Sequence, residues 1–154
     1  VHARLSQGLE SLHGGGTMSA SALLQRYARA LDDFDFQTVI GLFADDAEYR
    51  VQMRANFERN GVLHLVRDSH QSLRLRCATH PANQLPRSRH VLGEVTSAAD
   101  GQSAQASFSV ERDGKPTFVG EYRVRLTPGE PARFKELLAV LDGESCPSQI
   151  MVPI

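Results

Sequence analysis

The second half of the chain alternates apolar and polar residues with a period of two, and this pattern limits most strongly the folds open to it. In residues 117–126 the side chains of Phe118, Tyr122 and Val124 share one face, and Glu121 lies on the other. Such alternation is typical of a strand with one buried face. The same pattern predicts four long strands, at residues 88–97, 104–112, 117–126 and 132–142.

Turn-forming residues separate these strands and indicate how they connect. Residues 99–102 (Ala-Asp-Gly-Gln) and 113–114 (Asp-Gly) are typical of tight turns between strands. Residues 128–129 (Pro-Gly) end the third strand. The last strand finishes in the apolar run LLAVL, which favours a central place covered on both faces. We therefore expect an antiparallel meander of four strands.

The first half of the chain is predicted to begin with helices. Apolar residues recur at helical spacing in residues 23–31 and again in residues 36–43, and Ser19 or Ser21 can cap the first helix. Residues 47–53 then alternate with a period of two, which predicts a further strand.

A third helix is predicted after Asp68 or Ser69, with Leu73 and Cys77 facing inward. Because the helices precede the run of four strands and do not alternate with them, a parallel sheet with crossover helices is excluded. The expected fold class is α+β, with a strongly curved antiparallel sheet whose concave face is covered by the N-terminal helices.

The length of 154 residues (16.9 kDa) predicts one domain, which we place at residues 18–154. Residues 1–17 lack periodicity and end in three glycines and a threonine before Met18. We interpret them as an N-terminal extension, either a remnant of cloning or a native arm that packs on a partner, with the native start at Met18.

Composition excludes several classes of protein. The 17 Lys and Arg residues balance 18 Asp and Glu residues, so neither nucleic acid nor an anionic membrane is an expected partner. No apolar run is long enough to span a bilayer, and residues 1–17 do not have the pattern of a signal peptide. Cys77 and Cys146 are expected to be reduced thiols of a cytoplasmic protein.

Residues 27–51 (YARALDDFDFQTVIGLFADDAEYRV) open an ordered series of motifs. The later motifs, in chain order, are Val51, Arg54, Asn56, Glu58-Arg59, Gly61, Asp68-Ser69, Leu73-Arg74, Arg76, Arg89-His90-Val91, Gly120-Glu121-Tyr122, Leu126 and Val140-Leu141-Asp142. This collinear series covers about 115 residues. It resembles the β (small) subunits of aromatic-ring-hydroxylating dioxygenases, whose fold is the NTF2-like cone.

The chain departs from that family's pattern at three places. Val39 stands at or near a position where the family has a tryptophan, and this chain has none. Val124 and Leu75 replace acidic residues of the family pattern. These differences leave the aromatic substrate open, as well as the choice between a monooxygenase and a dioxygenase.

The resemblance implies a structural platform without a cofactor of its own. In such enzymes a large α subunit carries a Rieske [2Fe–2S] cluster and a mononuclear iron, and the subunits assemble as α3β3, so an α subunit partner and self-association as a trimer are expected. A Rieske centre needs paired cysteine and histidine ligands, whereas Cys77 has only His80 nearby. Since His64, His70 and His80 do not share a helix face, we predict no metal site in this chain.

One polar segment and one apolar segment are candidates for subunit contacts. The polar residues just after the first predicted strand offer guanidinium, amide and carboxylate groups. The apolar residues 149–154 (QIMVPI) are expected to be buried against a neighbouring subunit, and the alternative is that they fold back over their own sheet. The predicted interface residues are Arg54, Asn56, Glu58, Arg59, Arg89, His90, Ile150, Met151 and Val152.

The alternative function is a stand-alone enzyme of the same fold. SnoaL-like and scytalone-dehydratase-like dehydratases, isomerases and hydrolases use the cone as a pocket with acid and base groups. In this chain Asp46, Tyr49 and His90 are the residues that could converge there, because strand residues point inward alternately. In the competing interpretation Tyr49 packs in the core, Asp46 caps a turn and His90 bonds across a subunit contact.

Overall fold

The computed structural model describes residues 19–154, so the prediction for residues 1–17 lies outside the described residues. The described part of the chain begins with helix α1, Ala20–Asp32. The side chain of Ser19, one of the two predicted caps, caps this helix. Helix α2 spans Phe36–Gly41, and the turn between the helices holds Phe34 at a positive φ of 55°. Both predicted helices are confirmed.

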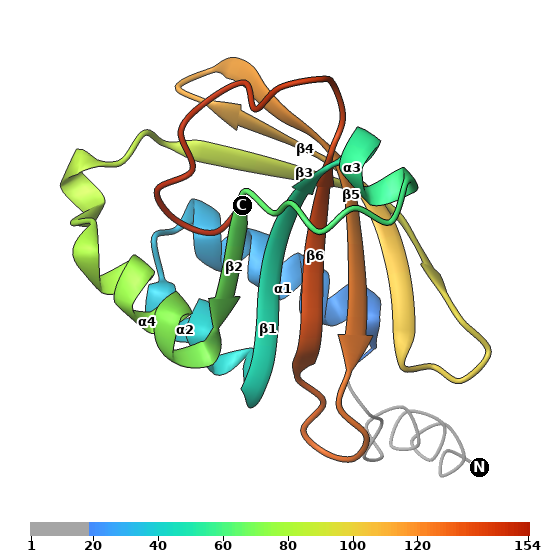
Figure 1. Ribbon diagram of the computed structural model, residues 1–154. Helices are drawn as coiled ribbons and strands as arrows, with labels where there is room; N and C mark the ends of the chain where they lie inside the picture. Colours follow the sequence, from blue (N-terminus) through green and yellow to red (C-terminus); the bar gives the residue numbers. More distant parts are fainter. Residues whose placement is uncertain (1–18) are drawn as a thin grey trace, which may run out of the picture.

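Six strands form a single sheet in the order β2-β1-β6-β5-β4-β3 (Figure 1). The four long strands predicted in the second half of the chain are confirmed, and the run LLAVL lies in β6 near the centre of the sheet, as expected. The bounds of the strands are β1 Phe43–Met53, β2 Val66–Ser69, β3 Ser88–Ser97, β4 Ser103–Arg112, β5 Lys115–Leu126 and β6 Phe134–Leu141.

One strand pair differs from the predicted antiparallel arrangement. Strand β1 pairs with β6 in parallel, with Tyr49 opposite Leu137 and Val51 opposite Ala139, whereas the other four pairs are antiparallel. Local alternation fixes which face of a strand is buried, but it does not fix which edge of a meander an earlier strand joins, or in which direction.

Two short helices and a one-turn helix complete the described chain. Helix α4, His70–Thr79, is capped by Ser69 and buries Leu73 and Cys77, which confirms the predicted third helix. Helix α3, Arg54–Glu58, and strand β2 were not predicted, because five and four residues are too few to show a period. A 3₁₀ turn, η2, spans Ala82–Gln84.

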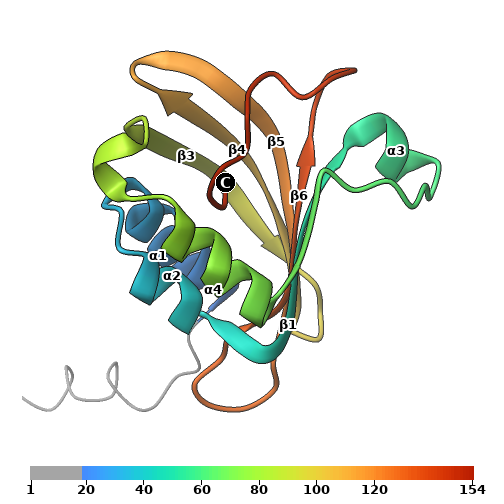
Figure 2. The same cartoon turned by 60° about the vertical axis from the view of Figure 1, so that its left-hand side comes forward.

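The sheet is strongly curved, and helices α1, α2 and α4 lie against one side of it (Figure 2), while α3 projects away from them. The chain after β6 turns back across the mouth of the curved sheet, so that its last residues lie close to the helices. The architecture is an α+β cone, which confirms the predicted fold class. The interior of this cone is where a ligand or an active site would lie in such a fold.

Candidate functional site

The interior of the cone contains all three tyrosines of the chain. Tyr27 comes from α1, Tyr49 from β1 and Tyr122 from β5, and each is fully buried. The Tyr27 ring contacts Tyr122 edge to face at a centroid distance of 5.9 Å and Phe43 at 6.1 Å. One helix and two strands that are far apart in sequence therefore bring three phenol groups into one apolar space.

The main chain of Ile154 is bonded to two of these phenol groups. The Tyr27 hydroxyl donates to the Ile154 main-chain oxygen at 2.7 Å, and the Ile154 N–H donates to the Tyr49 hydroxyl at 3.0 Å. The Ile154 side chain is buried in the same core cluster. Residue 154 thus occupies the space that the cone encloses.

Burial changes the acidity of the tyrosines. Burial raises the pKa of Tyr27 well above its ordinary value, and the neighbouring Tyr49 raises it further. Burial likewise raises the pKa of Tyr49 and of Tyr122. All three phenols are therefore neutral at physiological pH and act there as hydrogen-bonding groups.

A carboxylate–imidazole pair lies at the wall of the same interior. Asp32, the last residue of α1, has its Oδ1 atom 2.6 Å from Nδ1 of His90 on β3, and it accepts the His90 backbone N–H at 2.9 Å. The Ser88 hydroxyl donates to Asp32 at 3.0 Å. The His90 side chain is only 2% exposed. Helix α1 and strand β3 pack directly on each other, which holds this pair in place.

The Asp32–His90 pair is arranged as a base held by a carboxylate. Burial raises the pKa of Asp32, but the hydrogen bonds from His90 and Ser88 outweigh it and leave this pKa below its ordinary value. An ionised Asp32 accepts the proton on Nδ1, and in the neutral imidazole with that tautomer Nε2 is the acceptor. Nε2 is buried and has no hydrogen-bond partner among residues 19–154.

Asp46 does not join Tyr49 and His90. Its side chain is 73% exposed and forms an ion pair with Lys135 on β6. The register of β1 against β6 shifts between Phe43 and Glu48, and this irregularity places Asp45 and Asp46 on the solvent side. Burial of Tyr49 and its bond to Ile154 agree with the interpretation of Tyr49 as a core residue.

Sequence reasoning missed Asp32 as the acidic partner of His90. The two residues are 58 positions apart, and their contact depends on how α1 packs on β3, which no local pattern reveals. The available signal was the resemblance itself, because both residues lie inside its motifs, in the Leu-Asp pair of residues 31–32 and in the Arg-His block of residues 89–91.

Two predicted interface residues make contacts within their own chain. Arg54 lies 2.5 Å from Asp142 and 3.5 Å from Glu121, so its guanidinium joins α3 to β5 and the end of β6. Asn56 is buried and accepts a hydrogen bond from Gln52 at 2.5 Å. These two side chains stabilise the α3 turn from within the chain.

Of the other predicted interface residues, His90 has its side chain buried against Asp32, whereas the rest keep accessible surface. Glu58, Arg59 and Arg89 are exposed. In the segment that follows β6, Ile150, Met151 and Val152 are half-buried, and Ile150 packs against the core of its own chain. The segment therefore folds back over its own sheet, which is the alternative to the expected burial against a neighbouring subunit.

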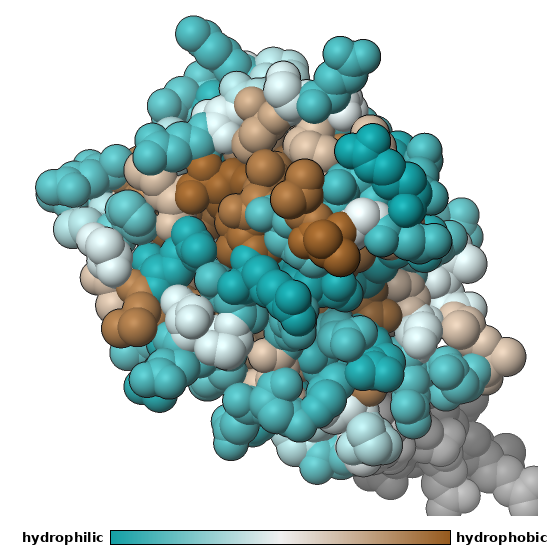
Figure 3. All heavy atoms as spheres, viewed as in Figure 1, coloured by the Kyte–Doolittle hydropathy of each residue, from teal (hydrophilic) through white to brown (hydrophobic). Residues whose placement is uncertain are grey.

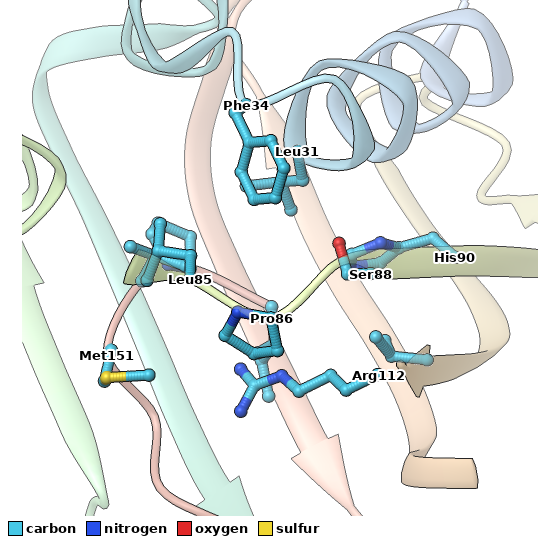
Figure 4. A pocket seen from close by; sticks show the side chains of 12 residues that line it. Leu31, Phe34, Leu85, Pro86, Ser88, His90, Arg112 and Met151 are labelled. Atoms are coloured by element: carbon cyan, nitrogen blue, oxygen red, sulfur yellow. The ribbon is translucent and has the colours of Figure 1, made fainter. Parts of the chain in front are cut away.

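A small cavity of ≈ 20 Å³ remains between this segment and the wall of the cone. Figure 4 shows Leu31 and Phe34 on one side of it, with His90, Arg112 and Met151 around the rest. A space of this size holds about one water molecule. The last residues of the chain thus fill almost all of the interior that a ligand would need.

Apolar side chains also gather at the surface beside α3. In Figure 3 the brown patch lies where the loop after α3 and the end of the chain run in Figure 1. Val62 is 84% exposed, Leu63 72% and Leu65 45%. Adjacent exposed apolar residues of this kind are typical of a contact surface for another protein.

The described residues do not fit an iron centre. No group of three His, Cys, Asp or Glu side chains comes together within residues 19–154, and both Cys77 and Cys146 are free thiols. No helix in this part of the chain is long and apolar enough to cross a membrane.

The fold is similar to that of several solved structures. A protein from Novosphingobium aromaticivorans, described as the beta subunit of an aromatic-ring-hydroxylating dioxygenase, is 26% identical and has a TM-score of 0.73, with 87% of this chain and 94% of that chain covered. The beta subunit of benzoate 1,2-dioxygenase from Burkholderia mallei is 17% identical with a TM-score of 0.60, and 82% and 93% are covered.

The same fold occurs in proteins of a different description. A protein from Kribbella flavida described as a ketosteroid isomerase is 15% identical with a TM-score of 0.55, and the match covers 84% of this chain and 82% of that chain. No curated protein matches this chain in sequence. The family model described as the SnoaL-like domain matches residues 19–127, which include α1, the Asp32–His90 pair and all three tyrosines. The chain therefore belongs to the SnoaL-like domain family, with the NTF2-like fold.

Proposed function

We propose that this chain is the small (β) subunit of a Rieske-type aromatic-ring-hydroxylating oxygenase in aromatic compound catabolism. The observation that carries the proposal is the 26% identity to a protein described as such a beta subunit, over 94% of that chain. The collinear motifs of residues 27–142 support it independently, because they run through helices, strands and turns alike.

In this role the chain is a non-catalytic platform in an oxidoreductase complex. The Rieske cluster and the mononuclear iron belong to the α subunit, and the chain binds that subunit and other copies of itself in an α3β3 assembly. The surface beside α3 suits such a contact, because Val62 and Leu63 are apolar and exposed while Glu58 and Arg59 supply a charged rim.

Coexpression with a Rieske-type large subunit from the same genome tests the proposal. We expect the two chains to copurify in equal amounts. The substitution Leu63→Asp should reduce the recovered complex about tenfold or more, because it places a charge in an apolar contact. Leu75→Asp is the matched control, since Leu75 is 63% exposed on α4, away from the surface beside α3. Failure to copurify, or equal effects of both substitutions, would count against this role and this surface.

A second candidate function is favoured by one observation, the buried Nε2 atom of His90, which has no hydrogen-bond partner within residues 19–154. An imidazole held by Asp32 can take a proton from a substrate, and a phenol can donate one to a developing oxyanion. This candidate is a stand-alone dehydratase, isomerase or hydrolase. It predicts turnover by the chain without any partner and loss of that turnover in His90→Gln, whereas the platform role predicts no turnover by the chain alone.

A further inference from the structure

The segment that fills the cone is weakly held along most of its length. From Gly143 to Ile154 the described chain makes no backbone–backbone hydrogen bond and belongs to no helix or strand. Its bonds to the rest of the fold are the Arg112 guanidinium to the Gln149 carbonyl at 2.7 Å and the two tyrosine contacts of Ile154. Segments with few backbone bonds open at low free energy, without unfolding the sheet.

Departure of this segment exposes polar groups of the interior, some of which have no hydrogen-bond partner within residues 19–154. The Arg112 guanidinium on β4 pairs with no carboxylate in residues 19–154, and its only side-chain hydrogen bond in that range is to Gln149. The Tyr122 hydroxyl and His90 Nε2 are both buried and without a partner in the same range. Tyr27 and Tyr49 lose the main chain of Ile154. Buried polar groups without partners are costly, so this interior favours an occupant that bonds to them.

The chemistry of such an occupant follows from that of Ile154, which fills the interior in this structure. Ile154 brings a compact branched apolar group and a main-chain oxygen, which the Tyr27 hydroxyl binds. Arg112 adds a permanent positive charge at the wall of the same cavity, with its guanidinium 4.6 Å from the centroid of the Phe118 ring. A guanidinium and phenol donors beside apolar walls recognise a carboxylate on an apolar body.

We propose that the interior of the cone is a binding site for a small carboxylate with a compact apolar body, and that residues 149–154 close this site by occupying it. The inference goes beyond the platform role, which needs no ligand in the cone, and it does not depend on that role. The apparent affinity for such a ligand is lowered by the fraction of molecules in which the segment is in place.

Phenylacetate is a suitable probe, with phenylacetamide as its uncharged analogue, and binding to the chain alone is measured by calorimetry. Since the chain has no tryptophan and all three tyrosines line the interior, tyrosine fluorescence reports occupancy directly. The variant Ile154→Ala removes most of the apolar side chain that fills the cone, and so weakens the hold of residues 149–154 on the interior. The variant Ile150→Ala makes the same chemical change in the same segment, away from the tyrosines, and serves as the control.

We expect Ile154→Ala to bind phenylacetate at least about tenfold more tightly than the unsubstituted chain, and Ile150→Ala to bind it unchanged. Adding Arg112→Gln to Ile154→Ala should weaken the binding of phenylacetate about tenfold and leave the binding of phenylacetamide unchanged. A chain that ends at Ser148 should bind at least as tightly as Ile154→Ala, and circular dichroism verifies that each variant is folded.

Absence of phenylacetate binding by both folded variants, Ile154→Ala and the chain that ends at Ser148, overturns the proposal. Equal gains in Ile150→Ala and Ile154→Ala overturn the closing role of residues 149–154. If Arg112→Gln weakens the binding of phenylacetamide as much as that of phenylacetate, the proposed specificity for a carboxylate is overturned. None of these results bears on the platform role, because no large subunit is present in the experiment.

Discussion

At the scale of single residues, the cone interior combines neutral phenols with a charged carboxylate. The tyrosines are fully buried, and Asp32 retains access to solvent on one side while it binds His90 and Ser88. Both kinds of group make the stability of the fold depend on pH, but in opposite directions and in separate pH ranges.

The tyrosines predict a loss of stability in alkali. Their pKa values are raised by burial in the folded chain, so above about pH 10 the unfolded chain loses phenolic protons that the folded chain keeps. Stability is therefore fully present below pH 10 and falls above it, by up to about 1.4 kcal/mol per pH unit for each tyrosine. Tyrosinate absorbance should rise together with unfolding measured by circular dichroism. A rise in the folded chain before unfolding would contradict burial of these groups.

Asp32 predicts the opposite dependence in acid. Its pKa is lowered in the folded chain, so its contribution is present above about pH 4 and is lost as the pH falls through the folded pKa. Asp32→Asn should lower the free energy of unfolding at pH 7 by about 1–3 kcal/mol and flatten its decline in acid. Urea unfolding at pH 7 and pH 3.5 measures both effects. The neighbouring Asp33→Asn is the control, because Asp33 is exposed, and equal losses in both variants would contradict the role of Asp32.

At the scale of elements, the long segments were predictable and the short ones were not. Alternation over residues 117–126 and helical spacing over residues 23–31 extend through enough residues to identify a strand and a helix. Strand β2 and helix α3 are too short for a period. The Asp32–His90 pair and the position of Ile154 were not predictable either, because both depend on the packing of segments distant in sequence.

The central pair of strands also predicts a severe effect of one small substitution. Gly120 on β5 lies so close to β6 that a Cβ atom would overlap the Val140 carbonyl. Gly120→Ala should therefore cost about 1–3 kcal/mol of unfolding free energy, as overpacking does. Gly41→Ala is the matched control, since a Cβ there meets nothing within 4 Å and an alanine favours the helix. A tolerated Gly120→Ala would mean that β5 and β6 are further apart than described.

At the scale of the whole molecule, the cone presents one face suited to another chain. Residues 62, 63 and 65 are apolar and exposed together, and they lie beside the turn that Arg54 and Asn56 hold in place. Arg54 and Asn56, which the sequence offered as interface residues, thus also support the fold around this turn. The sequence could not reveal this, because Glu121 and Asp142, the partners of Arg54, lie far along the chain.

The proposed α3β3 arrangement also implies that the chain associates with copies of itself. We expect the purified chain to sediment as a trimer at high concentration, and a monomer under those conditions would argue against the α3β3 arrangement. Salt should have little effect on the trimer if apolar residues form most of the contact.

Native mass spectrometry of the coexpressed chains tests whether this chain is the platform of a larger oxygenase. We expect a complex with equal numbers of large and small subunits, in which iron remains with the large subunit when the two are separated. A small subunit that stays free of the large one, and that turns over substrate by itself, would contradict the platform role and favour the Asp32–His90 pair as an active site.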